Sequence, residues 1–114
     1  MILATIRMTF SAKGFGEALT VLRSMAEQSK FQPGCHSCRI YRSGETDNVL
    51  MFQQLWTDEE SMQAYLRSDD FRHLLLLLEM GIKPPEIRFD TISSSTGIET
   101  IEKARNHSGG WEGA

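Results

Sequence analysis

The chain has 114 residues, of which 40% are hydrophobic and 24% are charged, a composition typical of one globular domain rather than of a disordered chain. Its formal net charge of −3 at pH 7 excludes the basic surface that binds nucleic acid or an anionic membrane. The N-terminal residues lack the features of a signal peptide, and the leucine run at residues 74–78 is too short to span a bilayer. We therefore expect a cytoplasmic protein with no nucleic acid and no membrane among its partners.

Residues 2–10 alternate between apolar and mostly polar positions, which predicts a half-buried strand. After a turn at residues 11–14, apolar residues recur at helical spacing to about residue 29 and predict an amphipathic helix. The face that this helix buries is expected to contain Phe15, Ala18, Leu19, Leu22, Met25 and Ala26.

The two cysteines, Cys35 and Cys38, form a CxxC motif in the second predicted strand, residues 35–43. This motif is typical of redox centres and of half a zinc site, but no second CxxC or paired histidine completes a metal site. In a regular strand the two side chains point to opposite faces, with Cα atoms roughly 10 Å apart, beyond the reach of a disulfide. We therefore expect separate reduced thiols and no metal, followed by a hairpin connection at residues 44–47.

Residues 48–56 are rich in apolar and aromatic side chains with few polar gaps, which predicts a strand covered on both faces. Thr57 is followed three residues later by Glu60, and this is the pattern of a capping box. The next helix should therefore begin at about residue 58, with Met62, Tyr65 and Leu66 on its apolar face.

A second helix should follow directly, with Ser68 as its N-cap and two aspartates near the positive end of its dipole. Gly81 is the expected C-cap, and the two prolines at residues 84–85 prevent any continuation. Because this helix is apolar nearly all round, we expect other elements to cover it from more than one side. Phe71, Leu74, Leu75 and Leu78 share one of its faces, and Leu76 and Leu77 fill the remainder.

The last predicted strand covers residues 86–94, where Ile87 and Phe89 alternate with charged residues. A short helix should then run from Ile98 to about Arg105, and residues 106–114 have no periodicity and are expected to form a mobile tail. The order of elements predicts an α+β fold: a ferredoxin-like β-α-β-β-α-β sandwich with an antiparallel sheet, plus a short C-terminal helix. We expect one domain over residues 1–94 and an appended segment over residues 95–114.

Several sequence segments carry a resemblance to a known family: Pro33-Gly34-Cys35, Arg39-Ile40-Tyr41, Gln54-Leu55-Trp56, and residues 65–71. Over roughly residues 1–93 the chain resembles the antibiotic biosynthesis monooxygenase family of dimeric α/β-barrel proteins. The resemblance implies a homodimer formed by two sheets packed face to face, with a small apolar pocket between the sheet and the helices of each subunit. In the quinol and polyketide branch it implies oxidation without a metal, flavin or other cofactor, because the reduced aromatic substrate itself reacts with O₂.

Many members of that family have a glutamate two residues before the tryptophan and a histidine in the following helix, where this chain has Gln54 and Tyr65. Glutamine cannot act as a base and tyrosine is a poor base at neutral pH, so His73 becomes the best candidate base. The haem-degrading branch has a ligating histidine where Leu75 stands, which argues against haem degradation.

The resemblance and the residues together favour a cofactor-independent monooxygenase acting on a small reduced aromatic, such as a quinol or a polyketide-like phenol. The alternative is a non-catalytic ligand-binding or structural homodimer, in which Trp56 and Tyr65 are core residues and Arg39 pairs with a carboxylate across the dimer. The expected catalytic residues are Tyr65, His73 and Gln54, and the expected substrate-binding residues are Trp56, Phe71, Arg39, Leu74 and Leu78.

Overall fold

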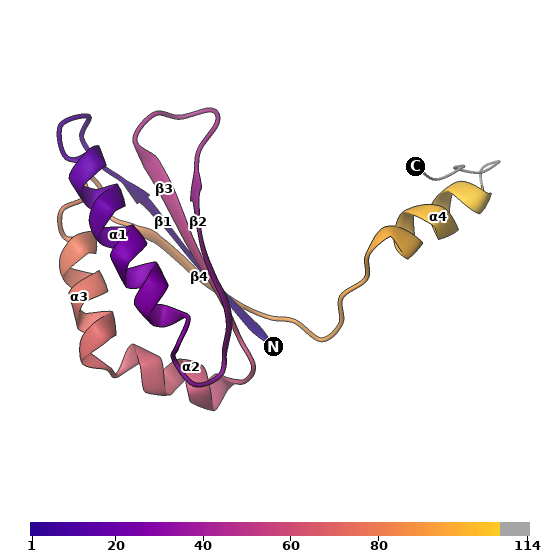
Figure 1. The fold of residues 1–114 in the computed structure, drawn as a ribbon. Coiled ribbons are helices and arrows are strands. Elements are labelled where there is room, and N and C mark those ends of the chain that lie inside the picture. The colour runs from indigo at the N-terminus through magenta and orange to yellow at the C-terminus, as the bar shows by residue number, and fades with distance from the viewer. Residues whose placement is uncertain (108–114) are drawn as a thin grey trace.

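The computed structural model describes residues 1–107, and its fold is one four-stranded antiparallel sheet with three helices on a single face. A fourth helix stands apart at the end of an extended segment (Figure 1). This confirms the predicted α+β ferredoxin-like class. The elements are β1 (Ile2–Thr9), α1 (Phe15–Ser29), β2 (Cys35–Arg42), β3 (Val49–Trp56), α2 (Glu59–Leu66), α3 (Asp69–Leu78), β4 (Glu86–Thr91) and α4 (Ile98–His107).

The strand order is β2-β3-β1-β4, so β1 and β3 are central and β2 and β4 are edges. Ile6 of β1 lies opposite Phe52 of β3 and Ile87 of β4 on the face that the helices share. The alternation predicted for the first strand is confirmed, because every second residue of β1 is buried beneath the helices. Each large side chain buried in this layer contributes about 1.5–3 kcal/mol to stability.

The cap of α2 differs from the prediction. Asp58 is the N-cap, and its carboxylate accepts the backbone N–H of Ser61 at 2.7 Å. Thr57 instead donates its hydroxyl and its backbone N–H to the carbonyl oxygen of Gly34. The predicted N-cap was therefore wrong by one residue. The hydrogen bonds of Thr57 instead connect the end of β3 to the turn before β2.

Helix α3 confirms the predicted Ser68 cap, whose hydroxyl accepts the backbone N–H of Phe71 at 3.2 Å. The prediction that this helix is covered from several sides is wrong. Leu74, Leu77 and Leu78 are buried, but Leu75 and Leu76 are 44% and 53% exposed. The C-cap is Glu79 rather than Gly81, and Gly81 lies where the chain comes close to the carbonyl oxygen of Thr9.

Strand β4 ends at Thr91, three residues earlier than predicted. Ile87 and Phe89 point to the same face as the core residues of β1, yet their side chains stay 47% and 45% exposed. The reason is that α1, α2 and α3 pack over the other strands and against one another. Helix α4 includes residues 106 and 107, which were expected in the tail; the rest of that tail, residues 108–114, lies outside the described residues. Within residues 1–107, no helix is long and apolar enough to cross a membrane.

Strand β2 contains a β-bulge that changes the predicted geometry of the two cysteines. Cys35 pairs with Trp56 and Cys38 pairs with Gln54, while the register shifts between Cys35 and Ser37. Both cysteines therefore face the helices. Their partners on β3 are two positions apart, which corresponds to about 6.6 Å between Cα atoms along the strand. The expectation of opposite faces and a roughly 10 Å separation was wrong, because it assumed a regular strand; the two thiols are nevertheless free.

Gly34 offers a direct test of how the turn before β2 meets α2. Its φ is +81°, and a Cβ there would lie 2.4 Å from the Cβ of Ser61. Gly34→Ala should lower the free energy of unfolding by more than the ~1–2 kcal/mol that a left-handed conformation costs an L-residue. Gly44→Ala is the control, because Gly44 is exposed with open space at its Cβ, and urea unfolding should show a change within about 0.5 kcal/mol. Equal losses for the two variants would contradict this account of the turn.

The cysteines provide a second test. Burial raises the pKa of both thiols, that of Cys38 to about 12, and Cys35 is the less buried of the two. Because the thiolate is the reactive form, native protein should alkylate slowly at pH 8, at Cys35 before Cys38, whereas unfolded protein should alkylate rapidly at both. Peptide mapping with and without denaturant measures this order. A Cys35–Cys38 disulfide in native protein, or Cys38 reacting first, would contradict the prediction.

Candidate functional site

A buried polar cluster lies between the helices and the end of the sheet where β3 meets α2. Its members come from four different elements, and all are nearly inaccessible to solvent. We define it by five residues: Ser29 at the end of α1, Cys38 in β2, Gln54 and Trp56 in β3, and Tyr65 in α2.

Three aromatic rings form one wall of this cluster. The centroids of Trp56 and Tyr65 are 5.0 Å apart with planes tilted by 33°, and Tyr65 and Phe71 meet edge to face at 5.6 Å. The capped turn at Ser68 sets α3 against α2, which brings Phe71 onto Tyr65. Such pairs add about 0.5–1.5 kcal/mol beyond the area that they bury, so the stack holds α2 and α3 against β3.

The Tyr65 hydroxyl shares a buried hydrogen bond of 3.2 Å with the Ser29 hydroxyl. Burial raises the pKa of Tyr65, and the hydrogen bond with Ser29 and the nearby Gln54 side chain only partly oppose this. Tyr65 is therefore a neutral hydrogen-bonding group at pH 7 and not a base. Ser29 was not among the residues expected in the site, although its spacing from Leu22 and Ala26 places it on the buried stripe of α1.

Two donors in the cluster lack an acceptor among residues 1–107: the side-chain amide nitrogen Nε2 of Gln54 and the indole Nε1 of Trp56. Gln54 is 3% exposed and Trp56 is fully buried, so bulk water does not satisfy either group. The Gln54 side chain lowers the pKa of both Tyr65 and Cys38, yet its Nε2 makes no hydrogen bond of acceptable geometry to either residue. A buried unsatisfied donor costs about 1–3 kcal/mol, so this pair is expensive for the fold unless something else accepts from it.

Cys38 closes the cluster on the β2 side. Burial is the main reason why its pKa rises to about 12, and the neighbouring Cys35 thiol raises it further. The thiol is therefore protonated at every physiological pH and is a weak donor rather than a nucleophile. No set of three or more metal-ligating side chains is gathered anywhere in the described chain.

The structure brings Gln54, Trp56, Tyr65 and Phe71 together, but it separates the remaining candidates from them. Leu74 and Leu78 are buried in the neighbouring apolar core, which Phe71 joins to the aromatic cluster. His73 is exposed on α3. Arg39 pairs with Gln53 and so lies on the opposite face of the sheet from Gln54. The roles predicted for His73 and Arg39 remain predictions without support from the geometry.

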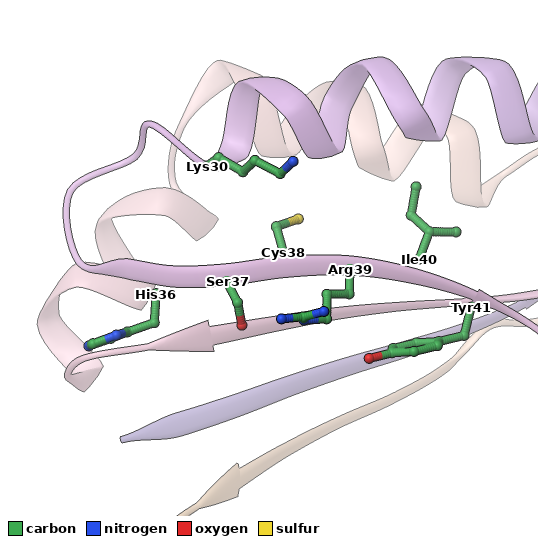
Figure 2. A pocket seen from close by; sticks show the side chains of 7 residues that line it. All are labelled: Lys30, His36, Ser37, Cys38, Arg39, Ile40 and Tyr41. Carbon is green, nitrogen blue, oxygen red and sulfur yellow. The ribbon is translucent and has the colours of Figure 1, made fainter.

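The family resemblance implied an apolar pocket between the sheet and the helices, but here Gln54 is enclosed and the rings of Trp56 and Tyr65 are stacked. A hollow of about 500 Å³ lies instead along β2. Figure 2 shows that Cys38 and Ile40 point from β2 toward α1, whereas His36, Arg39 and Tyr41 point to the other side of the strand. The hollow therefore follows the edge of the sheet and meets the buried polar cluster only at Cys38.

Comparison with solved structures shows the same fold in several proteins. A candidate antibiotic biosynthesis monooxygenase from Deinococcus radiodurans has a TM-score of 0.79 at 13% identity, over 86% of this chain and 98% of that one. A conserved protein from Methanosarcina mazei Go1 has a TM-score of 0.73 at 26% identity, over 78% and 89% of the two chains. SnoaB, a cofactor-independent oxygenase from Streptomyces nogalater, has a TM-score of 0.71 at 20% identity, over 82% and 94%.

Curated protein sequences give no match. The family model described as antibiotic biosynthesis monooxygenase matches residues 1–75, which include β1 to α2, most of α3, and the whole buried polar cluster. The match therefore extends over more than half of the chain and confirms the resemblance noted in the sequence. The chain belongs to the antibiotic biosynthesis monooxygenase family.

Proposed function

We propose that the chain is a cofactor-independent monooxygenase that acts on a small reduced aromatic, a quinol or a polyketide-like phenol, in the buried polar cluster. The observation that carries this proposal is the pair of buried donors, Gln54 Nε2 and Trp56 Nε1, that lack an acceptor. An oxygen atom of a phenol or its anion would accept from both. Membership of the family and the fold shared with SnoaB support the reaction class.

The two donors also suggest how the chain would promote the reaction. Hydrogen bonds from Gln54 and Trp56 to a phenolate oxygen favour the charged form and so lower the pKa of the bound phenol. The electron-rich anion then reacts with O₂: one oxygen atom bonds to the ring carbon, and the other leaves as water with two hydrogens from the substrate. The substrate supplies the electrons, so no protein group needs to be oxidised.

The cluster contains no group that is a base at neutral pH, because burial raises the pKa of both Tyr65 and Cys38. The pH dependence of turnover should therefore follow the ionisation of the substrate. Tyr65 would orient the substrate through its hydroxyl and its ring. Since the stack of Trp56, Tyr65 and Phe71 is closed, substrate binding requires these rings to move apart.

That closed stack is also the observation that favours the alternative function. If the rings do not part, the chain is a structural homodimer, or it binds a ligand without chemistry. Both alternatives keep the fold and lack O₂ consumption, so quinol binding and O₂ uptake by the wild type distinguish them from a monooxygenase.

We further propose that the chain forms a homodimer through the face of the sheet that no helix covers. This face contains partly exposed apolar side chains at Leu3 and Leu55, which pair directly, and at Met51 and Tyr41, which also pair. A twofold contact would remove all of them from water at once. Arg7–Glu86 and Arg88–Asp90 already form ion pairs of 2.9 Å within one chain, so pairing across the dimer is not needed to neutralise these charges.

The site proposal predicts the behaviour of two variants. Gln54→Leu and Trp56→Phe each remove one unsatisfied donor and should reduce O₂ uptake with a quinol at least tenfold, because one hydrogen bond to a charged oxygen contributes about 1.5–3 kcal/mol. Gln54→Leu should change the free energy of unfolding by no more than about 1 kcal/mol, since the donor that it removes is unsatisfied. His73→Ala is the control and should keep the full rate, because His73 is exposed and outside the cluster.

Activity that survives in both cluster variants, or is lost in His73→Ala, would move the site elsewhere. A wild type that neither binds quinols in a thermal-shift assay nor consumes O₂ with them would support the structural alternative.

The dimer proposal is tested by Leu55→Arg, which places a charge on the uncovered face in the central strand β3, opposite Leu3. Light scattering after size exclusion should show the wild type as a dimer and this variant shifted toward monomer. Leu76→Arg is the matched control, because Leu76 is 53% exposed on α3, on the other side of the sheet. A dimer that is unchanged in Leu55→Arg would place the interface on another surface.

A further inference from the structure

Helix α4 is held away from the rest of the molecule. The segment between β4 and α4 continues outward from the end of the strand, and α4 lies well beyond the sheet (Figure 1). The radius of gyration is 17.3 Å, and a compact chain of this length is expected to have one of about 13 Å. Ile98 and Ile101, three residues apart and therefore on one side of α4, are 53% and 50% exposed. A ten-residue helix is marginal in water by itself, so α4 needs a surface that covers this side.

The same chain has an apolar groove that nothing in residues 1–107 fills. The groove has a volume of about 590 Å³ and lies where α3 ends and β4 begins. Its exposed apolar side chains include Leu75, Ile82 and Ile87, which are 44%, 64% and 47% exposed. Lys83 lies at its border. It differs from the hollow beside β2, whose lining includes Lys30, His36 and Arg39, because its own lining is largely aliphatic.

We propose that the groove binds helix α4 of a second copy of this chain, so that Ile98 and Ile101 enter it. The binding mode is that of an amphipathic helix in an apolar groove. The groove lining contains two charged residues, Glu79 and Lys83, and Lys83 is the one that suits Glu102, which lies one helical turn after Ile98 beside the apolar side of α4. The contact is separate from the sheet-to-sheet contact proposed above, because the groove is on the helix side of the sheet.

The position of the groove favours a second copy over the chain's own α4. The groove lies at the start of β4, whereas α4 follows its end, about 20 Å farther along a strand of six residues. The backbone N–H of Ile92 donates to the carbonyl oxygen of Met1 at 2.8 Å, which anchors the start of the linker at that far end. To reach its own groove, α4 would have to reverse within residues 92–97, and in the structure these residues lead away from the sheet (Figure 1).

The test uses the full chain in two isotopic forms, unlabelled and ¹⁵N-labelled. Equal amounts are mixed, and native mass spectrometry first verifies that the subunits have exchanged. A carbodiimide then couples Lys83 to Glu102 or Glu99 if the groove holds α4. With α4 docked on a second copy, about half of the cross-linked peptide pairs should join a labelled to an unlabelled chain.

Matched variants tie the cross-link to the apolar contact. Ile101→Gln in α4 and Ile82→Gln in the groove should each reduce the cross-link at least fivefold, and neither should affect folding because both residues are exposed. Lys103→Gln introduces the same residue two positions after Ile101, on the other side of α4, and should leave the cross-link unchanged.

Cross-links found only within labelled or only within unlabelled chains would show that α4 folds back onto its own groove and would overturn the proposal. Absence of any Lys83 cross-link to α4 would overturn it as well. Neither result depends on monooxygenase activity or on the effect of Leu55→Arg, so the failure of this proposal can be told from the failure of the others.

Discussion

The stacking of Trp56 on Tyr65 is the contact on which the rest of the structure depends. Trp56 is fully buried at the end of β3, and its ring centroid lies 5.0 Å from that of Tyr65. This contact fixes α2 where the chain leaves the sheet, and Phe71 extends it to α3. Because the same contact encloses Gln54 and orients the Tyr65 hydroxyl toward Ser29, the stability of the helix layer and the chemistry of the buried polar cluster cannot be separated.

The cluster is costly for a core. Gln54 and Trp56 each leave a buried donor unsatisfied, and an aliphatic side chain at position 54 would avoid one of these penalties. A fold that retains two such donors, two positions apart on one face of β3, supports the proposal of an acceptor that is present only part of the time. A substrate oxygen fits this description, and the raised pKa of Tyr65 and Cys38 leaves neutral groups around it that favour neither an added metal ion nor a protein-based nucleophile.

The helix layer is incomplete in one respect. Three helices cover β2, β3 and β1, but the helix-facing side of β4 stays half exposed at Ile87 and Phe89, and α3 leaves Leu75 in water next to it. Meanwhile α4 has an apolar side, at Ile98 and Ile101, that no other element within residues 1–107 buries. One chain therefore has two uncovered apolar surfaces, at opposite ends of β4, and this is the physical reason to expect a partner. A second copy of the chain carries both surfaces, so each surface of one copy has a complementary surface on the other.

The prediction that β3 is covered on both faces was wrong, because Met51, Gln53 and Leu55 stay partly exposed on the face that no helix covers. The sequence alone determined the order of the elements, the bounds of α1, the Ser68 cap and the alternating burial of β1, because these depend on local periodicity and local hydrogen bonds. It also placed Gln54, Trp56, Tyr65 and Phe71 near one another through the family resemblance. Only the tertiary structure decided that the β2 bulge turns both cysteines toward the helices and that Ser29 hydrogen-bonds to Tyr65. It also decided that Arg39 and His73 lie outside the cluster. Finally, it decided that Leu75, Ile87 and the apolar side of α4 stay exposed. These features depend on which strand is an edge and on which residues far apart in sequence meet, and neither is encoded in the spacing of residues along one element.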